Sequence, residues 1–268
     1  FETALSLPCA GQAMRRSALH HPLPNDSANA FITDPPYYDA VPYADLADFF
    51  YVWFRRTIKQ DHKTLMTEPL TPKLEQAIVW HPGSQEEREE YERKMTCAMG
   101  EGRRILSSNG VGVVVFAHKT TAGWESQLQA MINAGWIVSA SWPIDTEMGT
   151  RMNAMGTASL ASSVHLVCRP RKTSDDSVRT SDIGDWREVL FELPRRIHDW
   201  MPRLAAEGVV GADAIFACLG PALEIFSRYS RVEKASGEQV SLRDYLEQVW
   251  AAVSQEALRL VFEGADVS

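Results

Sequence analysis

The chain has 268 residues, of which 45% are hydrophobic and 23% are charged, as is ordinary for a soluble globular protein. This length suits one α/β domain of about 150–170 residues with a smaller appendage. The formal net charge of −8 argues against a general polyanion-binding surface, so contacts with nucleic acid would have to come from local clusters. No apolar run reaches the roughly 18–20 residues of a membrane span, so no membrane association is expected.

The cysteines and the first residues of the chain indicate its cellular compartment. The four cysteines form no C-x-x-C pair, so neither a zinc ribbon nor a redox motif is expected: Cys9, Cys97, Cys168 and Cys218. His62 and His81 have no partner at metal-ligand spacing, so no metal site is expected. The chain opens at Phe1 without a charged-then-apolar leader, which predicts a cytoplasmic protein. The missing initiator methionine indicates a fragment.

The first elements expected along the chain are a strand and a helix. Residues 1–29 are mainly loop, with a short strand-like run at Ala4–Leu7. Ala30–Thr33 combines small, β-branched and aromatic residues and predicts a buried strand, which the following prolines stop. Tyr43–Arg56 has apolar residues at helical spacing, with acids early and arginines late, and therefore predicts an amphipathic helix whose charges suit the helix dipole.

An insertion, a helix and a strand are expected next. Lys59–Gly83 shows no clear period and is longer than ordinary connections, and such loops are often functional. Ser84 and Glu87 form a capping-box pattern at the start of a helix, which Asn109-Gly110 is expected to end. Val111–Phe116 is a nearly continuous apolar, β-branched run, which predicts a central strand covered on both faces.

A further helix and two strands complete the expected sheet. The helix around Trp124–Ile132 is closed by Asn133-Ala134-Gly135. Trp136–Trp142 and Ser163–Cys168 predict strands with no helix between them, so they should form an antiparallel pair at the sheet edge. The alternation of strands and helices predicts an α/β fold.

The remainder of the chain is expected to be a linker and a helical region. Residues 171–182 are polar and turn-rich, which is typical of a linker. Three helices are expected beyond it, at about 184–206, 212–229 and 242–263, and Pro194 and Pro221 should kink or break the first two. The predicted organisation is thus a catalytic half at residues 1–170, with an insert at about 59–83, and a helical C-terminal region at residues 183–268.

Polar and aromatic residues follow the strand at Ala30–Thr33. Proline fixes its own φ and disfavours the helical region for the residue before it, so Asp34-Pro35-Pro36 must leave the strand as a stiff, extended corner. Ligands of open α/β sheets bind at the carboxyl ends of strands. The Asp34 carboxylate and a proline carbonyl can accept the two hydrogens of an exocyclic base amine and hold its lone pair toward an incoming methyl group. Tyr37 can stack on the base.

The tetrapeptide Asp34-Pro35-Pro36-Tyr37 resembles the catalytic motif of S-adenosylmethionine-dependent amino-methyltransferases, chiefly the DNA adenine group. Longer segments, at Ile32–Tyr51, Phe116–Lys119, Leu160–Ser163 and Gly220–Glu224, are similar to large bacterial and archaeal adenine-specific DNA methylases that begin with a conserved domain of unknown function, DUF1156. The resemblance spans most of residues 25–230. It implies a class I, Rossmann-like methyltransferase sheet, S-adenosyl-L-methionine as cofactor, DNA as partner, and the four residues of the tetrapeptide as the catalytic set.

The chain departs from that family in its cofactor motifs. The F-x-G-x-G turn after a first strand is absent, and Phe216–Gly220 imitates it poorly within a predicted helix. We therefore expect only the second half of the methyltransferase sheet, with the cofactor half supplied by a missing N-terminal region or a partner chain. On its own the chain would then be an inactive part of an enzyme. Gln12 and Ala13 are the only candidates for contact with the cofactor's adenine.

Other residues are candidates for substrate contact, each with a structural alternative. Tyr38 and Tyr43 can line a base pocket or pack in the core. His118 and Lys119 end a neighbouring strand and can touch the base or a phosphate, or Lys119 can be a solvated strand-end charge. The insert, with Trp80, can flip a base or cap the corner. Paired arginines can contact phosphates or be surface charges: Arg55, Arg56, Arg103, Arg104, Arg195 and Arg196.

Three functions remain open from the sequence. The first is methyl transfer to the exocyclic amine of adenine in DNA after base flipping. The second is the same reaction on RNA or on cytosine, which the same corner can serve. The third is a non-catalytic DNA-binding or assembly subunit whose partner supplies cofactor binding. The negative net charge mildly favours such a partner.

Overall fold

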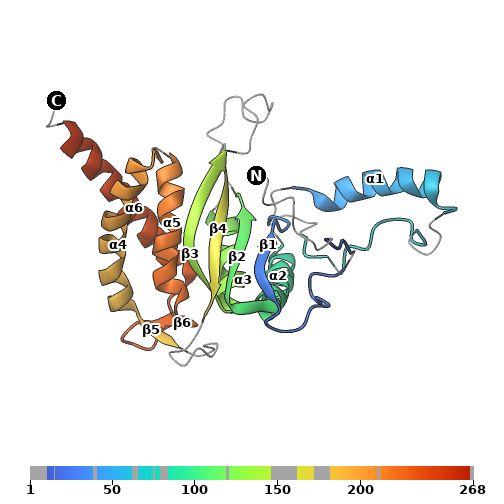
Figure 1. Ribbon diagram of the computed structural model, residues 1–268, viewed down its shortest axis with the longest axis horizontal. Coiled ribbons are helices and arrows are strands. Elements are labelled where there is room, and N and C mark those ends of the chain that lie inside the picture. The colour runs from blue at the N-terminus through green and yellow to red at the C-terminus, as the bar shows by residue number, and fades with distance from the viewer. Residues whose placement is uncertain are drawn as a thin grey trace.

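The computed structural model describes residues 11–14, 16–38, 41–61, 66–74, 76–78, 84–118, 121–145, 162–171, 182–209 and 212–265. Helices and strands alternate through most of this part of the chain (Figure 1). In chain order they are β1 (Ala28–Thr33), α1 (Tyr43–Ile58), α2 (Gln85–Ile105), β2 (Leu106–Phe116), α3 (Thr121–Asn133), β3 (Trp136–Asp145), β4 (Ser162–Pro170), β5 (Ile183–Asp185), α4 (Trp186–Ala206), α5 (Ala212–Ser227), β6 (Arg231–Glu233) and α6 (Leu242–Ala265).

The main sheet has four strands in the order β1-β2-β4-β3. Strand β1 pairs parallel with β2, whereas β4 pairs antiparallel with both β2 and β3. Strands β1, β2 and β3 therefore run in one direction, and β4 lies between β2 and β3 and runs in the opposite direction. The predicted α/β fold and the predicted antiparallel pair are confirmed. Because β1 and β2 are parallel, their carboxyl ends lie on the same side of the sheet, and the residues that follow them, Asp34 and Ala117, leave the sheet there.

One face of the sheet forms the core with helices α2 and α3. Trp136 is fully buried on this face and stacks on Phe31 with ring centroids 5.8 Å apart. Its indole N–H donates to the Met99 carbonyl of α2 at 3.0 Å. A Cβ at Gly112 would lie 2.5 Å from the Trp136 ring, so glycine is needed in β2 for this close approach. The core holds β1 and β2 in register beneath the candidate site.

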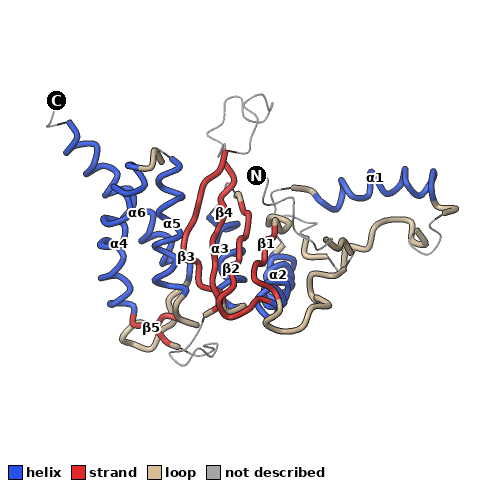
Figure 2. Tube along the Cα trace, in the orientation of Figure 1, coloured by secondary structure: helices blue, strands red, loops and turns tan. Residues whose placement is uncertain are grey.

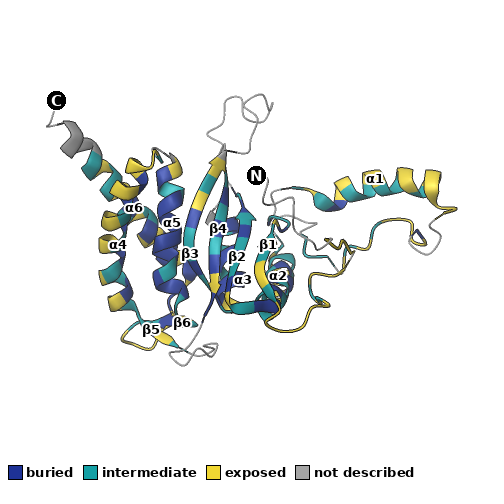
Figure 3. Ribbon diagram, viewed as in Figure 1, coloured by how far each residue is buried: buried dark blue, intermediate teal, exposed yellow. Residues whose placement is uncertain are grey.

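The second face of the sheet is much less covered. Its side chains include Ile32, Trp142 and Ile144, which are 71%, 43% and 45% exposed, and the half-buried Val113 and Val115. Figure 3 shows β2 and β4 toward the viewer, with α2 and α3 behind them. The predicted burial of strand 30–33 is wrong, because Ala30 and Ile32 are exposed and the other two residues are only partly buried. Likewise, within the described chain, helices cover only one face of the predicted central strand.

The two edges of the sheet differ in the described chain. Helix α5 packs along β3, where the Ser227 hydroxyl accepts from the Val138 N–H at 3.1 Å. A Cβ at Gly220 would lie 2.2 Å from the Ala140 backbone, so only glycine allows α5 to lie this close to the strand. Helix α5 thereby joins the C-terminal helices to the sheet. Strand β1, at the other edge, pairs only with β2.

Several predicted boundaries are wrong. Helix α2 ends at Ile105, and the chain passes directly into β2, so Asn109-Gly110 lies inside the strand. The register jumps there, from Ala28↔Leu106 to Ala30↔Val111, because these turn-forming residues make a bulge rather than a helix end. The cap at Ser84 is confirmed by its hydrogen bond from the Glu87 N–H.

The C-terminal region is not entirely helical. Helices α4 and α5 continue through Pro194 and Pro221, because packing compensates for the one backbone hydrogen bond that each proline removes. Short strands β5 and β6 form a parallel pair that periodicity did not predict. Most of the predicted linker, the run at Ala4–Leu7 and the first two residues of Leu160–Ser163 lie outside the described residues.

Helix α1 projects from the rest of the protein (Figures 1 and 2). The helix was predicted, but its apolar side chains are largely exposed: Leu46, Phe49, Phe50, Trp53 and Phe54. The described part of the insert forms neither helix nor strand. Asp48 attaches it to α1 by accepting from the Thr71 N–H at 2.9 Å and by pairing with Lys73 at 2.5 Å.

Candidate active site

The Asp34–Tyr37 corner lies where β1 leaves the sheet. The pairing of Thr33 with Val114 places the corner beside the last residues of β2. Pro35 is buried, whereas Asp34 is exposed and Tyr37 is partly exposed. The two prolines thus anchor the corner while the carboxylate and the phenol reach the surface. The sequence predicted this placement, because strand direction and proline geometry determine it.

Asp34 and Tyr37 contact each other within the corner. The Tyr37 hydroxyl donates a hydrogen bond to Oδ1 of Asp34 at 2.8 Å. The Tyr37 ring packs edge-to-face on Phe116 of β2, with centroids 5.1 Å apart. A ligand that needs this carboxylate oxygen must therefore share it with the phenol or displace it. The sequence did not predict this internal hydrogen bond.

Side chains from three elements hold the backbone of the corner. The Tyr91 hydroxyl of α2 donates to the Pro36 carbonyl at 2.8 Å. The Tyr43 hydroxyl, at the start of α1, accepts from the Tyr37 N–H at 3.4 Å. Nε2 of His118, just after β2, contacts the Tyr38 carbonyl. Burial raises the pKa of the Tyr91 hydroxyl well above its usual value, so the group stays protonated and can donate.

Tyr38 and His118 lie behind the corner. Tyr38 is 9% exposed and packs edge-to-face on Tyr91, with centroids 5.5 Å apart. His118 is 8% exposed, and its carbonyl accepts from the Trp124 indole at 3.0 Å. These contacts give both residues a role in supporting the corner, and their contact with substrate stays a prediction. Lys119 lies outside the described residues, as do Trp80, His62 and His81.

The described residues do not fit S-adenosylmethionine. Gln12 and Ala13 are both exposed. Phe216–Gly220 lies within α5, where Cys218 and Leu219 are fully buried. Gly220 contacts the Ala140 backbone closely and so serves helix packing rather than a ligand. The described chain therefore lacks the glycine turn at a strand end that brings backbone N–H groups to a nucleotide.

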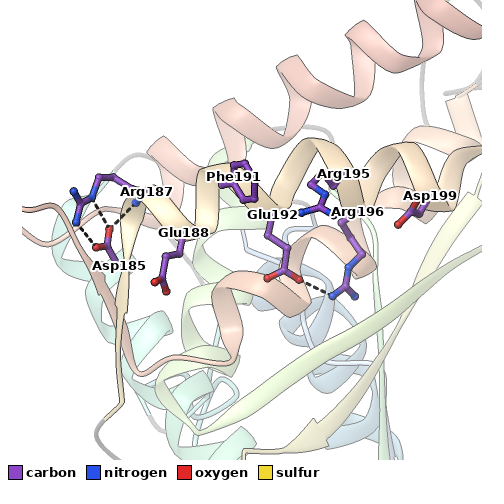
Figure 4. A pocket seen from close by; sticks show the side chains of 8 residues that line it. All are labelled: Asp185, Arg187, Glu188, Phe191, Glu192, Arg195, Arg196 and Asp199. Carbon is purple, nitrogen blue, oxygen red and sulfur yellow. Dashed lines mark hydrogen bonds and ion pairs between the residues drawn. The ribbon is translucent and has the colours of Figure 1, made fainter.

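Three of the paired arginines make contacts within the protein, whereas Nε of Arg103 is buried with no hydrogen-bond partner in the described chain. Arg196 pairs with Glu192 at 2.7 Å and with Glu224 at 2.6 Å, and Arg195 lies over the Phe191 ring. Arg104 binds Glu101. The α4 arginines line a hollow of about 730 Å³ whose charges include both signs (Figure 4): Asp185, Arg187, Glu188, Phe191, Glu192, Arg195, Arg196 and Asp199. These arginines are not arranged as a phosphate-binding cluster.

Sequence reasoning missed Tyr91, and it named Tyr43 only as a base-pocket candidate, not as a contact of the corner backbone. Tyr91 occupies an apolar position of its helix, so its periodicity predicted only core packing. The signal for its second role is chemical: a buried tyrosine hydroxyl needs a hydrogen-bond partner. A sequence alone does not identify that partner, because Tyr91 and Pro36 are 55 positions apart.

The comparisons with known proteins gave no match to a family model, a curated protein or a solved structure. Among the described residues, no group of three or more His, Cys, Asp or Glu side chains could hold a metal ion. None of the helices described has both the length and the apolar character needed to cross a membrane. The functional argument therefore depends on the geometry of the corner.

Proposed function

We propose that this chain contributes the amine-binding half of an S-adenosylmethionine-dependent methyltransferase that modifies the exocyclic amine of adenine in DNA. The observation that carries the proposal is the corner itself. An exposed carboxylate, a proline carbonyl and an aromatic ring follow β1 at the sheet edge where parallel β2 also ends. This is the position at which open α/β sheets bind ligands.

The hydrogen bonds distinguish the two proline carbonyls of the corner. The Pro36 carbonyl already accepts from Tyr91, and no described residue donates a hydrogen bond to the Pro35 carbonyl. We therefore assign the Asp34 carboxylate and the Pro35 carbonyl as the two acceptors for the amine hydrogens. Such acceptors favour a pyramidal nitrogen whose lone pair can attack a methyl group. The Tyr37 ring would stack on the flipped base.

The sheet topology supports the class I methyltransferase reading. In that fold the final strand runs antiparallel to the others and is inserted between the two strands that precede it. Strand β4 occupies this position between β2 and β3. The likeness concerns the arrangement of strands alone, and the chemistry of the corner gives it a function.

The methyl donor would be held by residues other than those described. The electrophilic methyl group of S-adenosylmethionine would be the reacting group there, but no described residue is suited to bind that cofactor. Two surfaces could receive a cofactor-binding unit, either an N-terminal region or a partner chain. They are the edge of β1, which is unpaired among the described residues, and the second sheet face, where Ile32 is 71% exposed. Parallel sheets are usually covered on both faces.

Replacing Asp34 tests the mechanism. Asp34→Ala, in a form of the protein that binds cofactor, removes one of the two acceptors and is expected to lower methyl transfer to unmethylated DNA on the order of a hundredfold. Asp45→Ala, an exposed acid on α1, is the matched control and should leave the rate unchanged. Undiminished methylation by Asp34→Ala would show that the mechanism is wrong.

The competing functions predict different products. Digestion of the methylated nucleic acid and identification of the modified nucleoside distinguish adenine in DNA from cytosine or RNA. A non-catalytic subunit is favoured by one observation, namely that the described residues lack a cofactor turn. Titration of the isolated chain with S-adenosylmethionine addresses that alternative, since tight binding would refute both it and the requirement for a separate cofactor unit.

A further inference from the structure

We propose that Tyr91 is a positioning residue that fixes the Asp34–Tyr37 corner through its hydroxyl group. The inference rests on the proposed function and deepens it, because it names a residue of α2 that acts on the site without touching substrate. Tyr91 is 1% exposed, and its hydroxyl donates to the Pro36 carbonyl at 2.8 Å. It thus reaches the corner from inside the core.

A fully buried amide stands behind the Tyr91 hydroxyl. Gln127 of α3 is 0% exposed, and its side-chain oxygen lies 3.4 Å from the tyrosine oxygen. Its amide nitrogen has no partner in the described chain. Turning the amide by 180° lets this nitrogen donate to the Tyr91 oxygen, which leaves the tyrosine proton for Pro36. The three groups then form a directed chain from Gln127 through Tyr91 to the corner.

The hydrogen bond acts on the part of the corner that proline leaves free. The rings of Pro35 and Pro36 fix φ at both residues, so ψ of Pro36 determines where its carbonyl and the following N–H point. That torsion also sets the direction in which Tyr37 leaves the corner. The Tyr91 hydroxyl holds the carbonyl, and the Tyr43 contact to the Tyr37 N–H is longer, at 3.4 Å. Tyr91 therefore orients the Tyr37 ring relative to the Asp34 and Pro35 acceptors.

The test compares Tyr91→Phe with Tyr245→Phe. Tyr245 is equally buried, and its hydroxyl donates to the Ala222 carbonyl in the C-terminal helices, so its variant loses the same kind of hydrogen bond without touching the corner. In a form of the protein that binds cofactor, assayed with labelled S-adenosylmethionine and unmethylated random-sequence duplex DNA, Tyr91→Phe should lower kcat about tenfold. Its KM for DNA should stay within about twofold, because the contact orients the reacting groups rather than binding DNA. Tyr245→Phe should lower Tm to a similar extent with kcat unchanged.

Each other outcome overturns the inference. An unchanged kcat in Tyr91→Phe, or an equal loss of kcat in both tyrosine variants, would reduce Tyr91 to a core residue. Gln127→Met removes the supporting amide at nearly constant volume and should lower kcat about twofold to threefold. This variant tests the same hydrogen-bond chain if Tyr91→Phe folds poorly. Asp34→Ala is measured in parallel, since undiminished activity in that variant would refute the proposed function itself, whatever Tyr91 shows.

Discussion

From the hydrogen bond between Tyr37 and Asp34 we expect, counterintuitively, that loss of the tyrosine hydroxyl raises the catalytic efficiency of methyl transfer. The hydroxyl occupies Oδ1 of Asp34 at 2.8 Å and competes with a substrate amine for that oxygen. An exposed hydrogen bond of this kind contributes about 0.5–1.5 kcal/mol. Tyr37→Phe should therefore raise kcat/KM for methyl transfer about twofold to tenfold.

Loss of the aromatic ring at residue 37 is expected to have the opposite effect and to lower kcat/KM. Phenylalanine retains the stacking surface and the edge-to-face contact with Phe116, whereas Tyr37→Ala loses about 1–3 kcal/mol of stacking on the base. Its kcat/KM should then fall about fivefold to 150-fold. Tyr51→Phe, which loses an exposed hydroxyl contact to the Glu68 carbonyl, is the control. Equal losses in the Phe and Ala variants of Tyr37 would refute the idea of competition and make the hydroxyl itself essential.

Two further predictions concern stability and do not depend on the proposed function. Gly220→Ala places a Cβ 2.2 Å from the Ala140 backbone and should lower the free energy of unfolding by roughly 3 kcal/mol. In Gly100→Ala the added Cβ meets nothing within 4 Å, so this variant should raise the free energy of unfolding by about 0.5–1 kcal/mol. Similar denaturant midpoints for the two variants would contradict this prediction. The hydrogen bond from Lys73 and those from Thr71 hold the pKa of Asp48 at about 2, below its ordinary 3.8. This lowered pKa stabilises the fold by at most about 2 kcal/mol above pH 4, and the contribution disappears as the pH falls through 2. Asp48→Asn should thus lower stability at pH 7 and match the unsubstituted protein near pH 2, and a difference that persists at pH 2 would show that charge is not its cause.

The sequence was sufficient for the elements that depend on local rules. The Ser84 cap, the helix end at Gly135 with its φ of +84° and the corner after β1 follow from hydrogen-bonding capacity and allowed backbone angles. The antiparallel pairing of β3 with β4 followed from the lack of a helical pattern in the sequence between them. Each of these features is set by residues close together in the chain.

Features that depend on distant residues were not predictable in the same way. Apolar composition suggested burial for Ile32, but burial depends on what packs over a strand, and the described chain leaves this side chain 71% exposed. Asn109-Gly110 has the composition of a turn, yet pairing with β1 keeps it within β2 as a bulge. The prolines of α4 and α5 failed as helix breakers because tertiary packing outweighs the loss of single backbone hydrogen bonds.

The edge of β1 that no described strand pairs with and the less covered sheet face meet at Ile32. Their geometry limits what can complete the site. A strand added parallel to β1 would end at the same edge as the Asp34 corner. A ligand bound at the end of that strand would then lie beside the acceptors for the amine, which is what transfer between two bound molecules requires. An antiparallel strand would place its carboxyl end at the opposite edge of the sheet, away from the corner. A cofactor-binding unit that adds to the β1 edge is therefore expected to do so through a parallel strand.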